Sequence, residues 1–158
     1  MSSLNHSLNQ IQRSTVVRAP RSRVWRAITD IAEFCKWFSA ETDEPAFRPG
    51  AHVNLRSTYP GASYKMEFSV DIEQMIPEHT FSWRWHPAAK AGGEDLSAEP
   101  MTLVTFTLED AEGGTRVTVT ETGFDQLFES RRSRVFEQNE AGWKIQIPAL
   151  ERYLSEAA

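Results

Sequence analysis

The fold is decided by residues 130–158, which read SRRSRVFEQNEAGWKIQIPALERYLSEAA. Five apolar residues recur there at steps of seven, four, three and four: Phe136, Trp143, Ile147, Leu150 and Leu154. These steps follow the helical repeat, so the five side chains form one stripe on a long helix. Charged and amide residues fill the positions between them and keep the other side in water. Such a helix must cover an apolar surface that the upstream chain supplies.

The helix begins with a basic cluster, residues 131–134 (RRSR). The whole chain nevertheless has a formal net charge of −5 and an isoelectric point near 5.4. A general nucleic-acid binder needs a basic surface that neutralises phosphates. We therefore expect no nucleic-acid partner, and we predict that residues 131–134 are a solvated helix face.

The upstream chain is composed mainly of predicted strands with one apolar face. A helical region over residues 21–38 interrupts them, and Thr29 or Asp30 is its expected internal cap. In the clearest strand, residues 64–73, apolar and polar side chains alternate without a fault, so Met66, Phe68 and Val70 are expected inside. The predicted strands are residues 11–18, 52–57, 64–73, 79–85, 102–108 and the segment around Val117 and Val119 that Gly123 ends.

This order predicts an α+β fold in which a curved antiparallel sheet wraps the long C-terminal helix. A length of 158 residues suits one domain, expected over residues 11–158 after a flexible N-terminus at residues 1–10. No run is long enough for a membrane span, so no membrane partner is expected. A single cysteine, Cys35, and the lack of an apolar leader favour the cytoplasm.

Several short motifs occur in an order that resembles the Activator of Hsp90 ATPase homologue 1-like family of the SRPBCC (START/Bet v 1-like) superfamily. The resemblance covers about residues 11–154. The motifs are Ala19-Pro20, Val24-Trp25, Trp37-Phe38, Phe47 with Pro49-Gly50, Gly114-Thr115-Arg116-Val117, Glu121-Thr122-Gly123-Phe124 and Gly142-Trp143. The resemblance implies a helix-grip fold with a hydrophobic cavity between sheet and helix. The chain departs from it in the long loop at residues 87–100 and in Pro148, where we expect the helix to bend.

The family name suggests an Hsp90-type chaperone as partner. The eukaryotic co-chaperone has an additional N-terminal domain for that contact, and this chain is too short to contain both, so we do not favour this partner. Some similar sequences are labelled oxidoreductase components. This chain lacks the cysteines for an iron–sulfur cluster and any Gly-x-Gly-x-x-Gly loop, so we expect no cofactor.

Catalytic and metal-binding patterns are weak. The four histidines are scattered, with His79 and His86 on opposite strand faces, so no metal site is expected. Cys35 has the surroundings of a core thiol. Glu121 falls by parity on the inner face at the end of the last strand, where it could bind a ligand or reach water, and we favour water because strand ends are usually solvated. No catalytic residue is predicted.

The excess of aromatic residues favours a ligand site, because five tryptophans and nine phenylalanines need either a large apolar interior or a pocket to accommodate them. The favoured function is binding of a hydrophobic or aromatic small molecule between sheet and helix. The alternatives are a stand-alone protein-interaction module related to Hsp90 co-chaperones, an enzyme acting on a hydrophobic substrate in the same cavity, and aromatic residues that only fill the core. The candidate ligand-binding residues are Trp37, Phe38, Met66, Phe68, Trp83, Trp85, Phe106, Glu121, Phe136 and Trp143.

Overall fold

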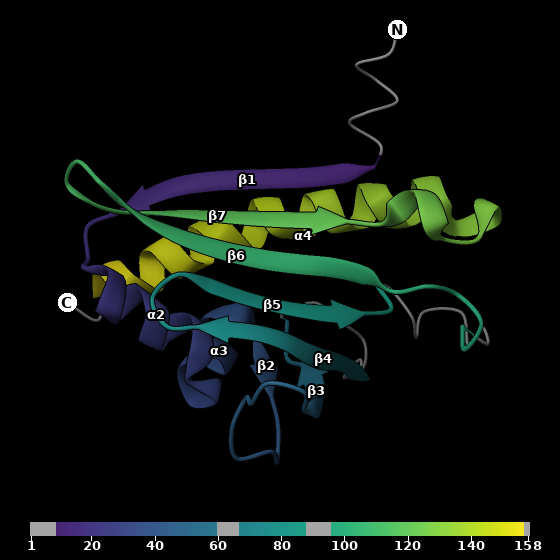
Figure 1. Cartoon of the computed structure of the whole chain (residues 1–158), viewed down its shortest axis with the longest axis horizontal. Helices are drawn as coiled ribbons and strands as arrows, with labels where there is room; N and C mark the ends of the chain where they lie inside the picture. Colours follow the sequence, from purple (N-terminus) through teal and green to yellow (C-terminus); the bar gives the residue numbers. More distant parts are fainter. Residues whose placement is uncertain (1–8, 60–66, 88–95, 157–158) are drawn as a thin grey trace, which may run out of the picture.

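A computed structural model describes residues 9–59, 67–87 and 96–156. Within these residues, one antiparallel sheet has the strand order β1-β7-β6-β5-β4-β3-β2 (Figure 1). The elements are β1 (Gln10–Val17), α2 (Arg21–Thr29), α3 (Ile31–Phe38), β2 (Ala40–Glu41), β3 (His52–Ser57), β4 (Glu67–Ile76), β5 (Thr80–Trp85), β6 (Thr102–Ala111), β7 (Gly114–Thr122), the 3-10 helix η1 (Phe124–Gln126) and α4 (Glu129–Glu156).

The helices lie on one face of this sheet, with α4 running along the β1 and β7 side and α2 and α3 beside the other strands (Figure 1). All five residues of the predicted apolar stripe on α4 are buried, from Phe136 to Leu154. Their burial confirms the amphipathic helix, and the whole arrangement confirms the predicted α+β helix-grip fold. The helix continues through Pro148 to Glu156.

Strand β4 follows the predicted alternation at first and then departs from it. Val70 and Ile72 are buried while Glu67 is exposed, as predicted. The pairing with β5 shifts register between Ile72 and Gln74, and the strand continues to Ile76, beyond the predicted end at residue 73. Residues 64–66 of that prediction lie outside the described part of the chain.

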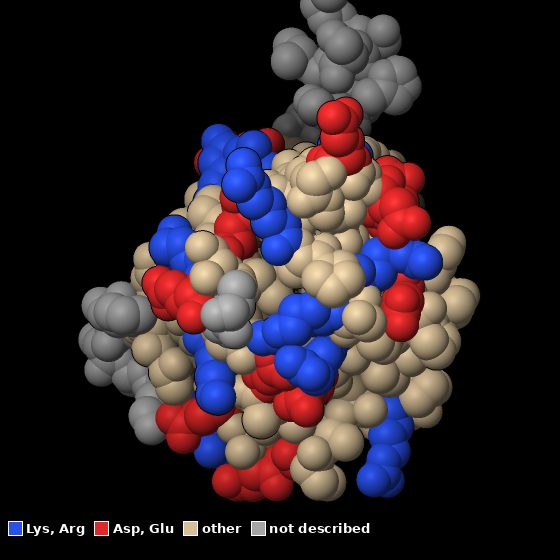
Figure 2. All heavy atoms as spheres, turned by 90° about the vertical axis from the view of Figure 1, so that its left-hand side faces the viewer, with Lys and Arg blue, Asp and Glu red and all other residues tan. Residues whose placement is uncertain are grey.

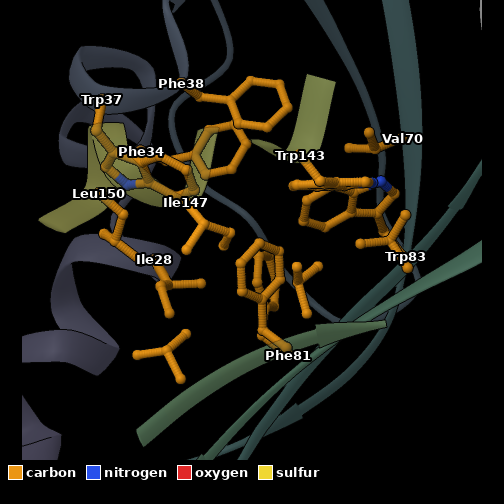
Figure 3. Packing of buried hydrophobic residues seen from close by; sticks show 14 of the residues in the cluster. Ile28, Phe34, Trp37, Phe38, Val70, Phe81, Trp83, Trp143, Ile147 and Leu150 are labelled. Carbon is orange, nitrogen blue, oxygen red and sulfur yellow. The ribbon is translucent and has the colours of Figure 1, made fainter. Parts of the chain in front are cut away.

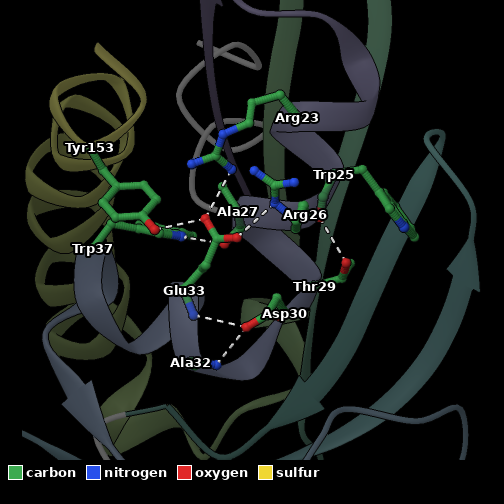
Figure 4. A network of polar contacts seen from close by, with 10 residues as sticks. All are labelled: Arg23, Trp25, Arg26, Ala27, Thr29, Asp30, Ala32, Glu33, Trp37 and Tyr153. Carbon is green, nitrogen blue, oxygen red and sulfur yellow. Dashed lines mark hydrogen bonds and ion pairs between the residues drawn. The ribbon is translucent and has the colours of Figure 1, made fainter. Parts of the chain in front are cut away.

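Local chemistry explains the boundary between α2 and α3. The Asp30 carboxylate accepts hydrogen bonds from the backbone N–H groups of Ala32 (3.0 Å) and Glu33 (3.1 Å), which makes Asp30 the predicted cap of α3 (Figure 4). Helix α3 ends at Ser39, whose φ of 58° is left-handed. The short strand β2 follows and pairs with β3. It was not predicted, because two residues are too few to show a period.

The pairing of β1 with β7 depends on a glycine at the turn between β6 and β7. A Cβ atom at Gly114 would lie 1.9 Å from the carbonyl oxygen of Val17 at the end of β1. Any side chain here would push β1 away from β7, so glycine lets these two strands pair along the full length of β1.

The basic cluster at the start of α4 differs from the prediction. Arg131 is 1% exposed, and its Nε lies 3.2 Å from the Glu99 carboxylate, which is itself buried. Arg131 also donates to the carbonyl oxygen of Pro87 at 2.8 Å, and the backbone N–H of Phe128 donates to Glu99 at 2.8 Å. The prediction of a solvated face was therefore wrong for Arg131, although it is confirmed for the exposed Ser133 and Arg134. Sequence periodicity could not show that a distant carboxylate folds onto this turn.

The buried side chains form one cluster between the sheet and the helices (Figure 3). On the face that carries α2 and the β6–β7 turn, basic and acidic side chains are interspersed (Figure 2). Among the described residues, no helix is long and apolar enough to cross a membrane. The assignment of residues 11–158 to a single domain stays a prediction.

Candidate ligand pocket

Most of the candidate aromatic residues gather around Trp143 of α4. Its ring centroid lies 5.8 Å from that of Phe106, 6.1 Å from Phe38, 6.4 Å from Trp85 and 6.5 Å from Trp83. Figure 3 shows Trp143 and Trp83 side by side. Because Trp83, Phe106 and Trp143 are almost fully buried, their rings fill the interior between α4 and β5–β6 and are packed against one another.

Three other candidates have different places. Trp37 is buried on α3, where its ring contacts Phe38 and Phe106 and its indole N–H donates to the carbonyl oxygen of Ala27 at 2.8 Å. Phe136 packs on Phe124, with ring centroids 5.1 Å apart. It lies two helical turns before Trp143, at the centre of the aromatic group. Met66 lies outside the described residues.

Two adjoining pockets open where this aromatic group reaches the surface, and we call them together the α3–α4 mouth. The first, of about 240 Å³, is lined by Phe38, Ser39, Ser57, Tyr59, Phe68, Gly142, Ile145 and Gln146. The second, of about 160 Å³, is lined by Phe38, Trp85, Gln138, Asn139, Gly142, Trp143 and Gln146. None of the described residues that line the mouth is charged. Tyr59 and Ile145 are exposed, so apolar surface continues around its rim.

Two residues of α4 give the mouth its shape. Gly142 has no side chain, and a Cβ atom built on it would have no neighbour within 4 Å, so the helix surface is open there. Gln146 donates a hydrogen bond of 3.0 Å to the carbonyl oxygen of Phe38, which joins α4 to the end of α3. Sequence reasoning missed Gln146 as a site residue, although it lies three positions after Trp143 and faces the same side of a helix.

Glu121 lies directly behind the wall of the mouth. It is 0% exposed, and its carboxylate accepts hydrogen bonds from the indole N–H groups of Trp85 (2.8 Å) and Trp143 (2.8 Å), the Thr102 hydroxyl (2.6 Å) and the Asn139 amide (3.0 Å). The prediction that favoured water for Glu121 was wrong, because β6 and α4 cover this end of β7. Asn139 was also missed, although its position four residues before Trp143 places both on one helix face.

A cluster around Glu33 joins the helices that form the mouth (Figure 4). Its carboxylate accepts hydrogen bonds from Arg23 (2.9 Å) and Arg26 (2.9 Å) of α2 and from the Tyr153 hydroxyl (2.7 Å) of α4. Burial alone would raise the pKa of Glu33, but the hydrogen bonds from Tyr153 and Arg23 outweigh it and hold that pKa below its ordinary value. The ionised carboxylate therefore fixes α3, which carries Phe38, against α2 and α4.

A larger hollow of about 480 Å³ lies on the outer face of β3 and β4. It brings together His52 and His86, which the sequence had left scattered, and His52 is hydrogen-bonded to Asp71. That pair is substantially exposed, and within the described residues no three His, Cys, Asp or Glu side chains form a potential metal site. Leu55, Phe68 and Met101 give the hollow apolar surface, but Arg56, Glu67 and Asp71 also line it, so its lining is charged, unlike that of the mouth.

Cys35 is half-buried at the end of α3. Burial and the nearby negative charge of Glu41 raise the pKa of its thiol, so the thiol stays protonated near neutral pH and is a weak nucleophile.

A profile of the family described as "Activator of Hsp90 ATPase homolog 1-like protein" matches residues 18–155. A search of curated proteins finds no significant match. Among solved structures, the chain is similar to a protein from Arthrobacter aurescens (TM-score 0.76, 18% identity, 94% of this chain and 87% of that chain). It is also similar to a protein from Mycobacterium smegmatis (TM-score 0.74, 20% identity, 93% of this chain and 91% of that chain). A third similar protein is from Mesorhizobium loti (TM-score 0.72, 21% identity, 94% of this chain and 98% of that chain). At these identities the three structures show the shared fold.

Proposed function

The chain belongs to the Activator of Hsp90 ATPase homolog 1-like family, and we propose that it binds an apolar or aromatic small molecule at the α3–α4 mouth. The fold family commonly binds hydrophobic ligands. The observation that carries the proposal is that partly exposed rings, Phe68 and Trp85, stand beside an uncharged pocket at the edge of a packed aromatic core. Pockets for small molecules are typically lined in this way, by apolar and aromatic walls with a few polar groups.

The size of the mouth limits the ligand. The two pockets, of about 240 Å³ and 160 Å³, lie below the usual range of about 300–1,000 Å³ for drug-sized ligands. A compound of one or two fused rings suits them. Its faces would contact Phe38, Phe68 and Trp85, and its edge would meet the amides of Gln138, Asn139 and Gln146.

The other candidate residues then have supporting roles. Trp37, Trp83 and Phe106 are buried behind the mouth and hold Phe38 and Trp143 in place through ring contacts. Phe136 anchors the first half of α4 on Phe124. In this proposal a ligand touches the outer edge of the aromatic group and does not enter its packed centre.

The proposal is tested by titrating naphthalene and recording the indole N–H signals of the five tryptophans by NMR. We expect saturable shifts for Trp85 and Trp143, which line the mouth, and smaller shifts for Trp25 on α2, which does not line it. If naphthalene produces no saturable shift, or shifts Trp25 most, the mouth is not a binding site.

A filling variant gives the sharper test. Gly142→Leu puts a side chain into open space within the mouth, and replacing glycine inside a helix favours the helix by roughly 1 kcal/mol. We expect at least tenfold weaker naphthalene binding with no loss of stability. Ala141→Leu adds similar bulk at an exposed neighbouring position that does not line the mouth, and it should bind like the parent. Equal binding by the two variants would contradict the proposal.

Association with an Hsp90-type chaperone is the alternative that the family name favours. The exposed apolar side chains Tyr59 and Ile145 at the rim provide a surface for it. A steady-state ATPase assay with an Hsp90-type chaperone separates the two functions. We expect no stimulation at stoichiometric amounts, and stimulation that Ile145→Glu abolishes would favour the alternative.

A further inference from the structure

We propose that Glu121 makes the α3–α4 mouth selective for charge, so that it accepts neutral and cationic apolar compounds and rejects anionic ones. This inference rests on the proposed function and adds the class of ligand. It follows from the position of Glu121, from the groups that bind its carboxylate and from the absence of charge on the described walls of the mouth.

The groups that bind the carboxylate suit its ionised form. Its Oε1 accepts from the Trp143 indole and the Asn139 amide, and its Oε2 accepts from the Trp85 indole, the Thr102 hydroxyl and the same amide. Indole and amide N–H groups only donate. Three of the four partners, the two indoles and the amide, therefore cannot accept a proton from the carboxyl group, and the arrangement suits an anion.

In the described part of the chain, no cationic side chain bonds the carboxylate of Glu121. Among the described residues, the hydrogen-bond partners of Glu121 are two indoles, a hydroxyl and an amide, all of which are neutral. These dipoles stabilise the carboxylate but leave its formal charge of −1 in place. Because the residue is fully buried, water screens that charge poorly on the side of the protein interior.

The charge acts at the mouth because a single layer of side chains separates them. Trp85, Asn139 and Trp143 bind the carboxylate, and the same three residues line the 160 Å³ pocket. A ligand in that pocket therefore lies one side chain away from Glu121. An anionic group there would meet repulsion that no described lining residue offsets, whereas a cation would gain attraction and could stack on the face of Trp85.

Three compounds of nearly equal size test this selectivity: 1-naphthalenemethanol, 1-naphthalenemethylamine and 1-naphthoate, which are neutral, cationic and anionic at pH 7. Calorimetry and the indole signals of Trp85 and Trp143 measure their affinities. We expect the amine to bind at least as tightly as the alcohol, and 1-naphthoate to bind at least tenfold more weakly than the alcohol. Affinities of alcohol and carboxylate within twofold of each other would overturn the inference while leaving the proposed function intact. If the alcohol itself does not bind, the proposed function fails.

Two charge variants locate the effect. Gln138→Lys places a cation on the lining of the mouth, and Glu137→Gln makes the same change in net charge at an exposed neighbour that does not line it. We expect the affinity for 1-naphthoate to rise at least threefold in Gln138→Lys and to stay unchanged in Glu137→Gln. An equal rise in both would mean that overall charge, and not the mouth, governs the selectivity.

Removing the charge itself gives the direct test. Glu121→Gln keeps the shape of the side chain, and we expect the alcohol and 1-naphthoate to bind within about threefold of each other. A tenfold preference that persists in a folded Glu121→Gln variant would overturn the role of Glu121. If the variant does not fold, the comparison of Gln138→Lys with Glu137→Gln decides.

Discussion

Two buried carboxylates, Glu99 and Glu121, are held in opposite ways. Glu99 is 3% exposed and pairs with Arg131, which is 1% exposed. Glu121 is 0% exposed, and the donors that bind it among the described residues are neutral. In the first region, charges of opposite sign are buried against each other. In the second region, the negative charge of Glu121 is not paired with a described cation, and it lies next to the mouth.

The difference separates a structural role from the role in recognition that we propose for Glu121. The Glu99–Arg131 pair joins the segment before β6 to the first turn of α4 and also holds the carbonyl group of Pro87. Nothing about this arrangement requires a ligand. Glu121 instead orients two indoles whose other surfaces line a pocket.

The largest effect is expected when Arg131 is replaced. Arg131→Met leaves Glu99 buried without its cation, and breaking a buried pair in this way typically costs about 3–5 kcal/mol. Urea unfolding measures the loss. Arg152→Met, at an exposed position of the same helix, should change the free energy of unfolding by less than about 0.5 kcal/mol. The double variant Arg131→Met/Glu99→Leu should recover most of the loss, and its failure to do so would show that the ion pair is not the cause.

A smaller loss is expected when the Glu121 carboxylate is removed. Glu121→Leu leaves the indole N–H groups of Trp85 and Trp143 and the amide of Asn139 without their acceptor, at a combined cost of about 2–4 kcal/mol. The same urea experiment applies, with the exposed Glu137→Leu as control. The indole signals of Trp85 and Trp143 should move upfield together as they lose their hydrogen bonds. Unmoved signals would contradict the assigned contacts.

The smallest effect concerns Glu33, a third carboxylate that is bound by both charged and neutral donors. Tyr153→Phe removes one hydrogen bond to it and should lower the free energy of unfolding at pH 7 by about 0.5–1.5 kcal/mol. Because the folded state holds the pKa of Glu33 below its ordinary value, this carboxylate stabilises the fold at neutral pH. That stability is lost as the pH falls from the ordinary value near 4.5 through the folded value.

The difference in the free energy of unfolding between the parent protein and Tyr153→Phe should therefore shrink over that acid range, because the phenol donates to the ionised carboxylate. Urea unfolding at pH 7 and at several acid pH values measures it. Tyr59→Phe, at an exposed tyrosine outside this cluster, is the control and should show no such change. A difference in the free energy of unfolding that stays constant with pH would show that the effect of Tyr153→Phe does not come from the ionised Glu33.

Periodic patterns in the sequence were enough to predict most of the architecture. The stripe from Phe136 to Leu154 and the alternation of Phe68, Val70 and Ile72 follow from burial on one side of a helix or strand, which any long element must show. The extension of β4 and the existence of β2 were not predictable in this way. A register shift and a two-residue strand depend on the partner strand and leave no period of their own.

Periodicity and the order of motifs were enough to predict the fold, the family resemblance and the aromatic residues that gather around Trp143. The folded chain was needed to show that Trp83 and Phe106 fill the core, that Phe136 lies apart and that the pocket opens beside Gly142. The two clearest errors, Arg131 and Glu121, are charged residues that the sequence assigned to water. Whether such a residue is buried depends on partners 32 and 18 to 36 positions away in the chain, and only folding brings those partners together.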